Sequence, residues 1–578
     1  MSQALLFSLL KSRHIRDVDH ALAMSLQRLD PETQELVAVA VALASKAHSL
    51  GHSCLPLDRL DDLLIEASAG PAPQIPEAQA FLAVLKTSAW VVKGESLQNC
   101  VLVLDQDTIA LKRYRDYENR LALNLVQRLA AGTKSISADM ENFRGELFPE
   151  SIESAQAVAA KRACETGFFL LTGGPGTGKT TTIGRLLQLL QYQANENASV
   201  LRIGLAAPTG KAATRLSESL RTVMGSGQLS VPVPVEQMEA KTLHRLLGSK
   251  PNSVQFRHDA GHPLPLDVLI VDEASMIDLP LVCKLLEALP LHARLILVGD
   301  PDQLPSVETG NVLRACCDAI ALRSDSERHR VHLERVYRQD ADSDIAVAAQ
   351  TVLSGDSGRF IQGLQQGHFR GVHWQAGSGR ALEKIIADEA VSHYQKIRRA
   401  NSLEQALKLS SEFRVLCAAR ESGAGSIAIN RYIANRLKKK SDADFYQGRL
   451  CLVTENTARE KLFNGDVGLC WPDEQGILRI WVETAAGLKA WHPANFPAHE
   501  DAYAITVHKS QGSEFERVLL VLPDASHRVL SRELLYTGIT RAKKRIEICA
   551  DQTSMMTAIS RQNRRWSLLS HRLSQNGH

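Results

Sequence analysis

The sequence has ten cysteines but no C-x-x-C pair, and its adjacent Cys316 and Cys317 fit no zinc-ligand spacing. A zinc module is therefore not expected. Cys417, Cys470 and Cys549 lie within apolar runs, where a buried free thiol is the usual state of a cysteine. Free thiols are typical of proteins that work in a reducing cytoplasm.

Long apolar runs are also missing. No run approaches the ~18 residues that a membrane-spanning helix needs, and no small-residue cleavage site follows the apolar stretch at residues 4–10. We expect no membrane contact, no signal peptide and a cytoplasmic location. The chain has neither a repeat of fixed period nor a low-complexity tract, and its net charge of +3 is too small to indicate nucleic acid by itself.

A phosphate-binding loop is the most informative feature that is present. Residues 173–180 read GGPGTGKT, with an apolar run before them and a helix-compatible run after them. The glycines allow successive backbone N–H groups to point at phosphate oxygens. Lys179 is expected to reach the β- and γ-phosphates of ATP, and the Thr180 hydroxyl to hold Mg²⁺. The expected ATP-binding residues of this loop are Gly173, Gly174, Pro175, Gly176, Thr177, Gly178, Lys179, Thr180 and Thr181.

At 578 residues, the chain is long enough for three or four domains. Residues 1–115 are predicted to be mostly helical, with helices at 31–48 and 58–67. Residues 116–150 are predicted to be a linker that contains a weakly structured polar stretch.

The remainder is predicted to form two α/β domains, at 151–345 and 346–578, each with a parallel sheet. A small β-module is expected within the second domain at about 441–500, with Asn464-Gly465 as a hairpin-type turn. The expected strands are short apolar runs at Phe168–Leu171, Ile203–Ala206, Val268–Val271, Leu295–Val298, Val415–Ala418, Tyr503–Val507, Val518–Leu522 and Ile546–Cys549.

Two further motifs follow expected strands of the first α/β domain. Asp272 and Glu273 end one strand. Asp272 is therefore suited to binding Mg²⁺, and Glu273 to acting as the base that orients the attacking water. Gln303 follows the next strand, and its amide can both donate to and accept from the γ-phosphate and the water. These roles depend on the position of both motifs after the phosphate-binding loop.

Two arginines complete the expected catalytic set. Arg338 and Arg541 could each bring a guanidinium to the charge that develops on the γ-phosphoryl group. Arg541 can do so only if the second α/β domain faces the first across a shared cleft. Closing such a cleft on ATP would move one domain relative to the other, which is the basis of a motor.

Loops of hydroxyl, imidazole and basic groups follow apolar stretches at three places and suit contacts to a phosphodiester backbone. Each alone is more often an ordinary cap or turn. The expected DNA-binding residues are Pro208, Thr209, Thr242, His244, Thr506, His508 and Lys509.

Together, these motifs resemble those of the superfamily 1 DNA helicases, and most closely the RecD family, the alpha subunits of exodeoxyribonuclease V. The segments that carry the resemblance are Gly173–Thr180, Leu205–Ala212, Thr242–Gly248, Val271–Ser275, Gly299–Leu304, Tyr337-Arg338, Val507–Glu514 and Tyr536–Ala542. The resemblance is strong over 150–578 and weaker over 1–115.

The resemblance implies two RecA-like motor domains and a 5′-to-3′ translocase and helicase that uses ATP and Mg²⁺ on single-stranded and duplex-end DNA. It also implies a heterotrimer with RecB-like and RecC-like subunits in double-strand-break repair and recombination. In that family pattern Gln156 contacts adenine, and residues 1–115 dock on the RecC-like subunit.

Three other interpretations stay open at this point. A stand-alone helicase of the same superfamily has the same motifs, and a helicase fused to a relaxase is disfavoured because the sequence has no H-x-H metal triad. A non-motor loading or structural subunit is disfavoured by the intact charged residues of the ATPase motifs. No acidic cluster exists beyond Asp272 and Glu273, so we expect no nuclease site in this chain.

Overall fold

The computed structural model describes residues 4–67, 71–93, 100–131, 135–196, 198–225, 239–250, 253–337, 344–377, 379–439, 443–457, 462–484 and 487–575. Among these, no helix is long and apolar enough to cross a membrane. The cysteines Cys417, Cys470 and Cys549 are buried free thiols, as predicted.

The N-terminal region combines helices with a small sheet. Its helices are α1 (Ala4–Lys11), α2 (Asp17–Leu29), α3 (Glu35–Ser49), α4 (Leu60–Ala67) and α5 (Ala78–Leu85). The predicted helices at 31–48 and 58–67 correspond to α3 and α4. Its sheet has the order β1-β4-β3-β2, with β1 (Leu55–Pro56), β2 (Val91–Lys93), β3 (Leu102–Asp105) and β4 (Thr108–Leu111). This sheet is not predictable from the sequence, because strands of two to four residues are too short to show a period of two.

The stretch 116–150, predicted to be a linker, instead contains two helices, α6 (Lys112–Ala130) and α7 (Ala138–Leu147). Three charged residues of α6, namely Arg115, Glu118 and Arg128, are buried and have hydrogen-bond partners. Arg128, for example, is fully buried and donates from Nη1 to the Ala293 carbonyl and from Nη2 to the Leu289 carbonyl, both at 2.6 Å. A buried guanidinium with carbonyl partners is structural, so the polar composition of this stretch was a misleading signal.

The first parallel sheet has the strand order β10-β5-β9-β8-β6-β7. Its strands are β5 (Phe168–Gly173), β6 (Ile203–Ala207), β7 (Lys241–Thr242), β8 (Val268–Val271), β9 (Arg294–Gly299) and β10 (Arg330–Leu333). The helices of this domain are α8 (Ala155–Glu165), which precedes β5, and α9 (Lys179–Glu196), α10 (Gly210–Gly225), α11 (Leu243–Leu247), α12 (Leu279–Ala288), α13 (Val312–Ala321) and α14 (Ser326–His329), which come after it in the chain. Phe168 and Leu170 belong to one hydrophobic core, and Phe169 and Leu171 to another. The sheet is therefore covered on both faces, which explains its continuous apolar strands.

The second parallel sheet has the order β11-β20-β19-β12-β18. Its strands are β11 (Val372–Gln375), β12 (Phe413–Cys417), β18 (Ala504–Thr506), β19 (Phe515–Val521) and β20 (Ala542–Cys549). Its helices are α15 (Ile345–Ser354), α16 (Ser357–Gln365), α17 (Arg380–Ile385), α18 (Ser392–Arg398), α19 (Leu403–Glu412), α20 (Ser426–Leu437), α21 (Arg532–Ile539) and α22 (Gln552–Ser560). All eight predicted strands of the two sheets are confirmed, to within a few residues.

An antiparallel β-module lies between α20 and β18 in the chain, as expected. Its order is β16-β15-β14-β13-β17, with β13 (Leu450–Val453), β14 (Val467–Pro472), β15 (Leu478–Thr484), β16 (Gly487–Trp491) and β17 (His499–Asp501). The turn at Asn464-Gly465 exists, closed by a 3.0 Å bond from Asp466 N to the Phe463 carbonyl. It is not a two-residue hairpin, because Gly465 alone has positive φ (99°), as in a type II turn, and β13 ends well before it.

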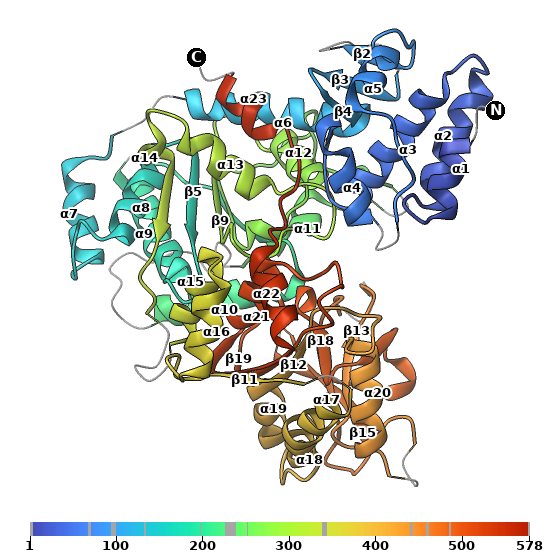
Figure 1. Cartoon of the computed structure of the whole chain (residues 1–578). Coiled ribbons are helices and arrows are strands. Elements are labelled where there is room, and N and C mark those ends of the chain that lie inside the picture. Colours follow the sequence, from blue (N-terminus) through green and yellow to red (C-terminus); the bar gives the residue numbers. More distant parts are fainter. Residues whose placement is uncertain are drawn as a thin grey trace.

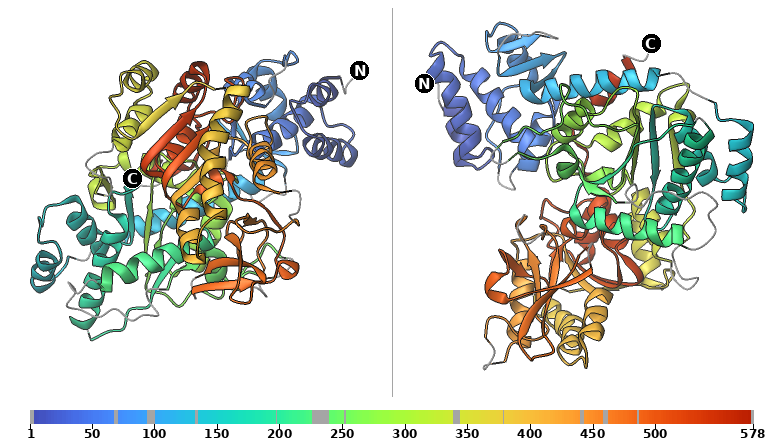
Figure 2. Two further views of the ribbon diagram at one scale, coloured as in Figure 1. Left: turned by 90° about the horizontal axis from the view of Figure 1, so that it is seen from below. Right: turned by 180° about the vertical axis from the view of Figure 1, so that it is seen from behind.

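The N-terminal region lies beside the first parallel sheet, and the second parallel sheet lies across from both, as Figure 1 and the right-hand view of Figure 2 show. The chain returns at its C-terminal end. After the second sheet, the chain ends in the helix α23 (Leu569–Gln575), which packs beside α6 and α13 (Figure 1). Leu569 and Leu573 of this helix belong to the core that contains Phe168 and Leu170.

Candidate functional site

The phosphate-binding loop connects the buried strand β5 to the first residue of α9. Gly176 and Gly178 have φ values of 78° and 86°, a region that glycine enters without strain. Lys179 Nζ donates to the carbonyls of Gly173 and Gly174, at 2.8 Å each. The lysine therefore lies folded over the loop, within reach of any anion that the loop's N–H groups would hold.

Gln156, near the start of α8, lies directly against this loop. Its Nε2 donates to the Thr177 carbonyl at 3.2 Å. A Cβ at Gly178 would come within 2.2 Å of the same nitrogen and would displace the Gln156 amide, and the φ of 86° also favours glycine there. The side chain of Gln156 is thus adjacent to the loop, where the family pattern implies an adenine contact.

The two acids follow β8 at the same edge of the sheet. Asp272 Oδ1 accepts from Glu273 N at 2.9 Å, and Glu273 has φ of 52°, an unusual conformation for a residue other than glycine. Burial raises the pKa of Asp272 above its usual range, the Glu273 carboxylate raises it further, and Lys179 opposes both effects. The pair is therefore a site of concentrated negative charge facing a lysine.

Gln303 is buried in the turn after β9. Its Nε2 donates to Asp300 Oδ2 at 3.1 Å, and its Oε1 has no hydrogen-bond partner among the described atoms. Asp300 Oδ2 also accepts from the Tyr536 hydroxyl of α21 at 2.8 Å. Gln303 is thereby linked to the second sheet through one shared carboxylate.

The second sheet contributes Arg541 to this site, from a position just after the end of α21. It is buried, with Nε donating to the Thr537 carbonyl at 3.1 Å and Nη1 to the Ser513 carbonyl at 3.2 Å. The other predicted arginine, Arg338, lies outside the described residues. The backbone N of Tyr337 donates to the Gly176 carbonyl at 2.9 Å, so Tyr337 lies against the phosphate-binding loop.

Groups from both sheets line one cavity of about 150 Å³. Its lining includes the predicted residues Pro175, Gly176, Gly178, Lys179, Thr180, Thr181, Asp272, Glu273, Gln303 and Arg541. A neighbouring cavity of about 600 Å³ shares Pro175, Gly176 and Asp300 and reaches α15 and Tyr536. The structure therefore brings together residues that are as much as 366 positions apart in the chain, from Pro175 to Arg541.

The predicted DNA-binding threonines all lie at strand ends and all cap a following turn. The hydroxyls of Thr209, Thr242 and Thr506 accept from backbone N–H groups three residues later, at 3.2, 3.2 and 3.3 Å. Thr242 belongs to the strand that pairs with Ala207, next to Pro208, and Thr506 pairs with Cys417. Each hydroxyl keeps its own hydrogen available for a phosphate oxygen.

The remaining residues of this set differ in their surroundings. His244 is exposed beside the Phe256 ring, and burial lowers the pKa of His508 to about 4, with Arg565 adding to the effect. Lys509 Nζ is paired with Glu500 Oε1 at 2.6 Å. This ion pair, which offsets the charge of Lys509, could not be predicted from the sequence.

Three residues at the junction of the sheets received no role from the sequence alone. Tyr536 bonds Asp300, Arg215 pairs with Glu514 and donates to the Gly512 carbonyl at 3.0 Å, and Gln511 Nε2 donates to the Leu304 carbonyl at 2.9 Å. Tyr536 and Gln511 lie inside recognised motifs, so their position was a signal. Arg215 lies in the middle of a helix and outside every distinctive motif, so the sequence carries no signal of its role.

Family models match three parts of the chain: an AAA domain at residues 156–309, a UvrD-like helicase C-terminal domain at 501–548, and the N-terminal domain of RecBCD enzyme subunit RecD at 11–109. RecBCD enzyme subunit RecD of Mycolicibacterium smegmatis is 35% identical over 97% of this chain and 98% of its own length. The ATP-dependent RecD2 DNA helicase of Deinococcus radiodurans is 29% identical over 92% of this chain and 68% of its own.

Among solved structures, Bacteroides Pif1 bound to single-stranded DNA is a distant likeness, with a TM-score of 0.39 and 16% identity over 70% of this chain and 94% of its own. The full-length match at 35% identity and the match of its N-terminal region to the RecD-specific model establish the family. The chain belongs to the RecD family of ATP-dependent DNA helicases, which includes the RecD subunits of RecBCD enzymes.

Proposed function

We propose that the protein is the ATP-driven motor of a RecBCD-type helicase-nuclease, moving 5′ to 3′ along single-stranded DNA and unwinding duplex ends. The observation that carries the proposal is the shared cavity, where Lys179 and Glu273 of the first sheet meet Arg541 of the second. A site divided in this way couples nucleotide turnover to relative motion of the two sheets. The polarity is taken from the family resemblance.

The residues of the cavity suit ATP with Mg²⁺. The loop amides and Lys179 would hold the phosphates, with Gln156 toward the base. Thr180 and Asp272 are oxygen ligands of the kind that Mg²⁺ prefers, and the ion would neutralise phosphate charge. Glu273 would orient and deprotonate the attacking water, and the unpartnered Oε1 of Gln303 would accept from it. Arg541 and Arg338 would stabilise the charge of the transition state.

For DNA, we propose a track along the carboxyl ends of both sheets. Thr209 and Thr242 would contact phosphates from the first sheet, and Thr506, His508 and Lys509 from the second. Pro208 and His244 flank the track. Lys509 would exchange its Glu500 partner for phosphate, so its contribution should depend strongly on salt.

We propose that residues 1–115 dock on a RecC-like subunit in a cytoplasmic heterotrimer that also holds a RecB-like subunit. The relatives' name, RecBCD enzyme subunit, supports this assembly. We propose that the nuclease resides in a partner subunit. Motor domains at 151–345 and 346–578 are proposed, with α6 packed on the first.

The test is the Lys179→Gln variant. Loss of the ammonium should reduce DNA-stimulated ATP hydrolysis by at least about 10²-fold, since electrostatic groups at this position are worth several kcal/mol, while the melting temperature stays unchanged. The exposed Lys408→Gln, on α19, is the matched control. Near-normal turnover in Lys179→Gln would refute the site. A wild-type protein that hydrolyses no ATP with DNA and partner subunits present would instead indicate a loading subunit.

A further inference from the structure

A second large cavity, of about 1050 Å³, lies between the N-terminal region, the second parallel sheet and the returning C-terminal segment. Leu50 and Ile65 line it from the N-terminal region, beside α4. His508 and Arg528 line it from the second sheet, and residues 561–564 close it on a further side. Figure 1 shows the path of the C-terminal segment from α22 to α23.

The charged groups of this cavity are unevenly matched. Three arginines (Arg528, Arg561 and Arg564) and two acids (Asp62 and Glu66) line it. Each acid has a partner: Asp62 pairs with Arg59 at 3.0 Å, and Glu66 with His52 at 3.1 Å. Asp62 is therefore paired with a cation, whereas the imidazole that bonds Glu66 accepts from Trp566 N at Nδ1 and leaves the charge of Glu66 uncancelled.

The arginines are exposed and largely unpartnered. Arg561 donates to the His527 carbonyl at 3.2 Å, whereas Arg528 and Arg564 have no ion pair or side-chain hydrogen bond within the described part of the chain. Arg528 also contributes, after burial, to the lowered pKa of the nearby Lys46. The wall of the cavity thus carries net positive charge, with three arginines against one uncancelled carboxylate, that of Glu66.

The cavity is continuous with the proposed DNA track. His508, a residue of that track, forms part of its lining, as does Leu304, which follows Gln303. Because its pKa is lowered to about 4, the His508 imidazole is neutral at physiological pH and can contact a base or donate to a phosphate. Ile65 and Val529 add apolar surface against which bases can pack.

We propose that this cavity binds single-stranded nucleic acid beyond His508, with Arg528, Arg561 and Arg564 contacting its phosphates and the N-terminal region forming the opposite wall. The inference rests on the proposed function, because the strand enters it along the track. It gives the N-terminal region and the C-terminal segment a direct part in DNA binding, in addition to docking.

The test compares the full-length Arg528→Gln/Arg564→Gln variant with wild type, using fluorescent oligo(dT) of increasing length at several salt concentrations. Arg561 is kept, because its bond to the His527 carbonyl is structural. Long oligonucleotides should bind at least about 10-fold more weakly, and the salt slope of log K should fall by about 1.4, about 0.7 for each lost phosphate contact. Oligonucleotides too short to pass His508 should bind as they do to wild type. Arg359→Gln, an exposed arginine of α16 outside the cavity, is the matched control.

Equal affinity and equal salt slope in the double variant and wild type, at every length, would overturn the proposal. So would unchanged DNA binding combined with loss of a RecC-like subunit, since the cavity would then be a protein contact. If wild type itself binds no single-stranded DNA, the proposed function fails instead. Melting curves identify a variant that has merely unfolded, and in that case Arg564→Gln alone replaces it in the same comparison.

Discussion

Tyr536 connects the two parallel sheets through a single hydrogen bond to the buried Asp300, which also holds Gln303. We predict that Tyr536→Phe leaves the fold intact but uncouples the sheets. A hydrogen bond to a charged group is worth about 1.5–3 kcal/mol, so DNA-stimulated ATP hydrolysis should fall roughly 10-fold or more. Steady-state hydrolysis with and without oligo(dT) measures this.

The matched control is Tyr432→Phe. The Tyr432 hydroxyl donates to the Glu383 carbonyl at 2.8 Å, and both residues belong to the domain of the second parallel sheet. Equal DNA stimulation in Tyr536→Phe and wild type would show that the bond has no part in coupling.

Glu118 is a buried carboxylate where the N-terminal region, α6 and the C-terminal segment meet. Its Oε1 accepts from the Ser53 and Ser567 hydroxyls at 2.6 Å each, and Oε2 has no partner among the described atoms. Burial raises the pKa of Glu118 above its unfolded value of 4.5. The native state therefore holds the proton more tightly, and stability is lost as pH rises through the folded pKa.

We predict that the melting temperature of Glu118→Gln equals or exceeds that of wild type at pH 8, and that any increase is smaller at pH 4.5. Each 1 kcal/mol of stability corresponds to about 2–4 °C in melting temperature. The exposed Glu474→Gln should change neither curve. An equal drop in melting temperature at both pH values would show that the charge of Glu118 is needed.

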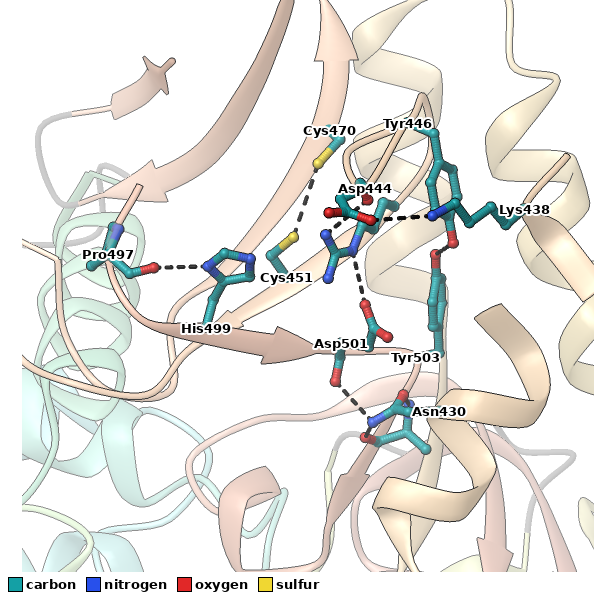
Figure 3. A network of polar contacts seen from close by, with 12 residues as sticks. Asn430, Lys438, Asp444, Tyr446, Cys451, Cys470, Pro497, His499, Asp501 and Tyr503 are labelled. Atoms are coloured by element: carbon teal, nitrogen blue, oxygen red, sulfur yellow. Dashed lines mark hydrogen bonds and ion pairs between the residues drawn. The ribbon is translucent and has the colours of Figure 1, made fainter. Parts of the chain in front are cut away.

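Among the elements, the β-module is held to the second sheet by a polar network (Figure 3). Asn430 of α20 donates to the carbonyls of Asp501 and Ala504, at 2.8 Å each, and accepts from Ala504 N at 2.8 Å. Arg449 pairs with Asp501 at 2.9 Å, and the hydroxyls of Tyr446 and Tyr503 lie 2.7 Å apart. The side chain of Asn430 thus satisfies backbone groups that no strand pairs.

We predict that Asn430→Ala destabilises the protein by about 2–4 kcal/mol, because it leaves buried backbone groups without partners. Urea unfolding followed by tryptophan fluorescence measures this. Asn495→Ala, at an exposed position of the same module, serves as the comparison. A similar midpoint for both variants would mean that water replaces the asparagine.

The strands of the two parallel sheets were predictable because their two covered faces require unbroken apolar runs, as in β8. The phosphate-binding loop was predictable because its chemistry is local. The N-terminal sheet and α6 were not, since the strands are too short and the buried polar residues of α6, such as Arg128, have partners more than 150 positions away. The pairing of Lys509 with Glu500 likewise depends on the fold of the module.

At the scale of the whole molecule, the C-terminal segment joins the N-terminal region and the domains of the two parallel sheets. Arg565 Nη1 donates to the Gly310 carbonyl at 2.9 Å, and Trp566 stacks on His52 with ring centroids 4.0 Å apart. Helix α23 then buries Leu569 in a hydrophobic core of the first parallel-sheet domain. The N-terminal region is thereby fastened to the first parallel sheet by residues from the far end of the chain.

We predict that Trp566→Ala loosens this junction, at a cost of about 1–3 kcal/mol for a partly buried aromatic side chain. Hydrogen exchange should increase at residues 51–53 and 306–310, with no change in the second parallel sheet. Trp481→Ala, in the β-module, provides the contrast, because its effect should stay in the module. Unchanged exchange at 51–53 in Trp566→Ala would show that other contacts fasten the N-terminal region.

The division of the nucleotide cavity between two sheets is the central claim, and Arg541 tests it most directly. Single-turnover ATP hydrolysis and binding of a fluorescent ATP analogue should be measured on Arg541→Gln and Arg541→Lys beside wild type, with melting curves to confirm the fold. We predict near-normal nucleotide binding and hydrolysis reduced by about 10³-fold or more, the scale set by arginines that act across a domain boundary. Hydrolysis at the wild-type rate in a folded Arg541→Gln protein would contradict this claim.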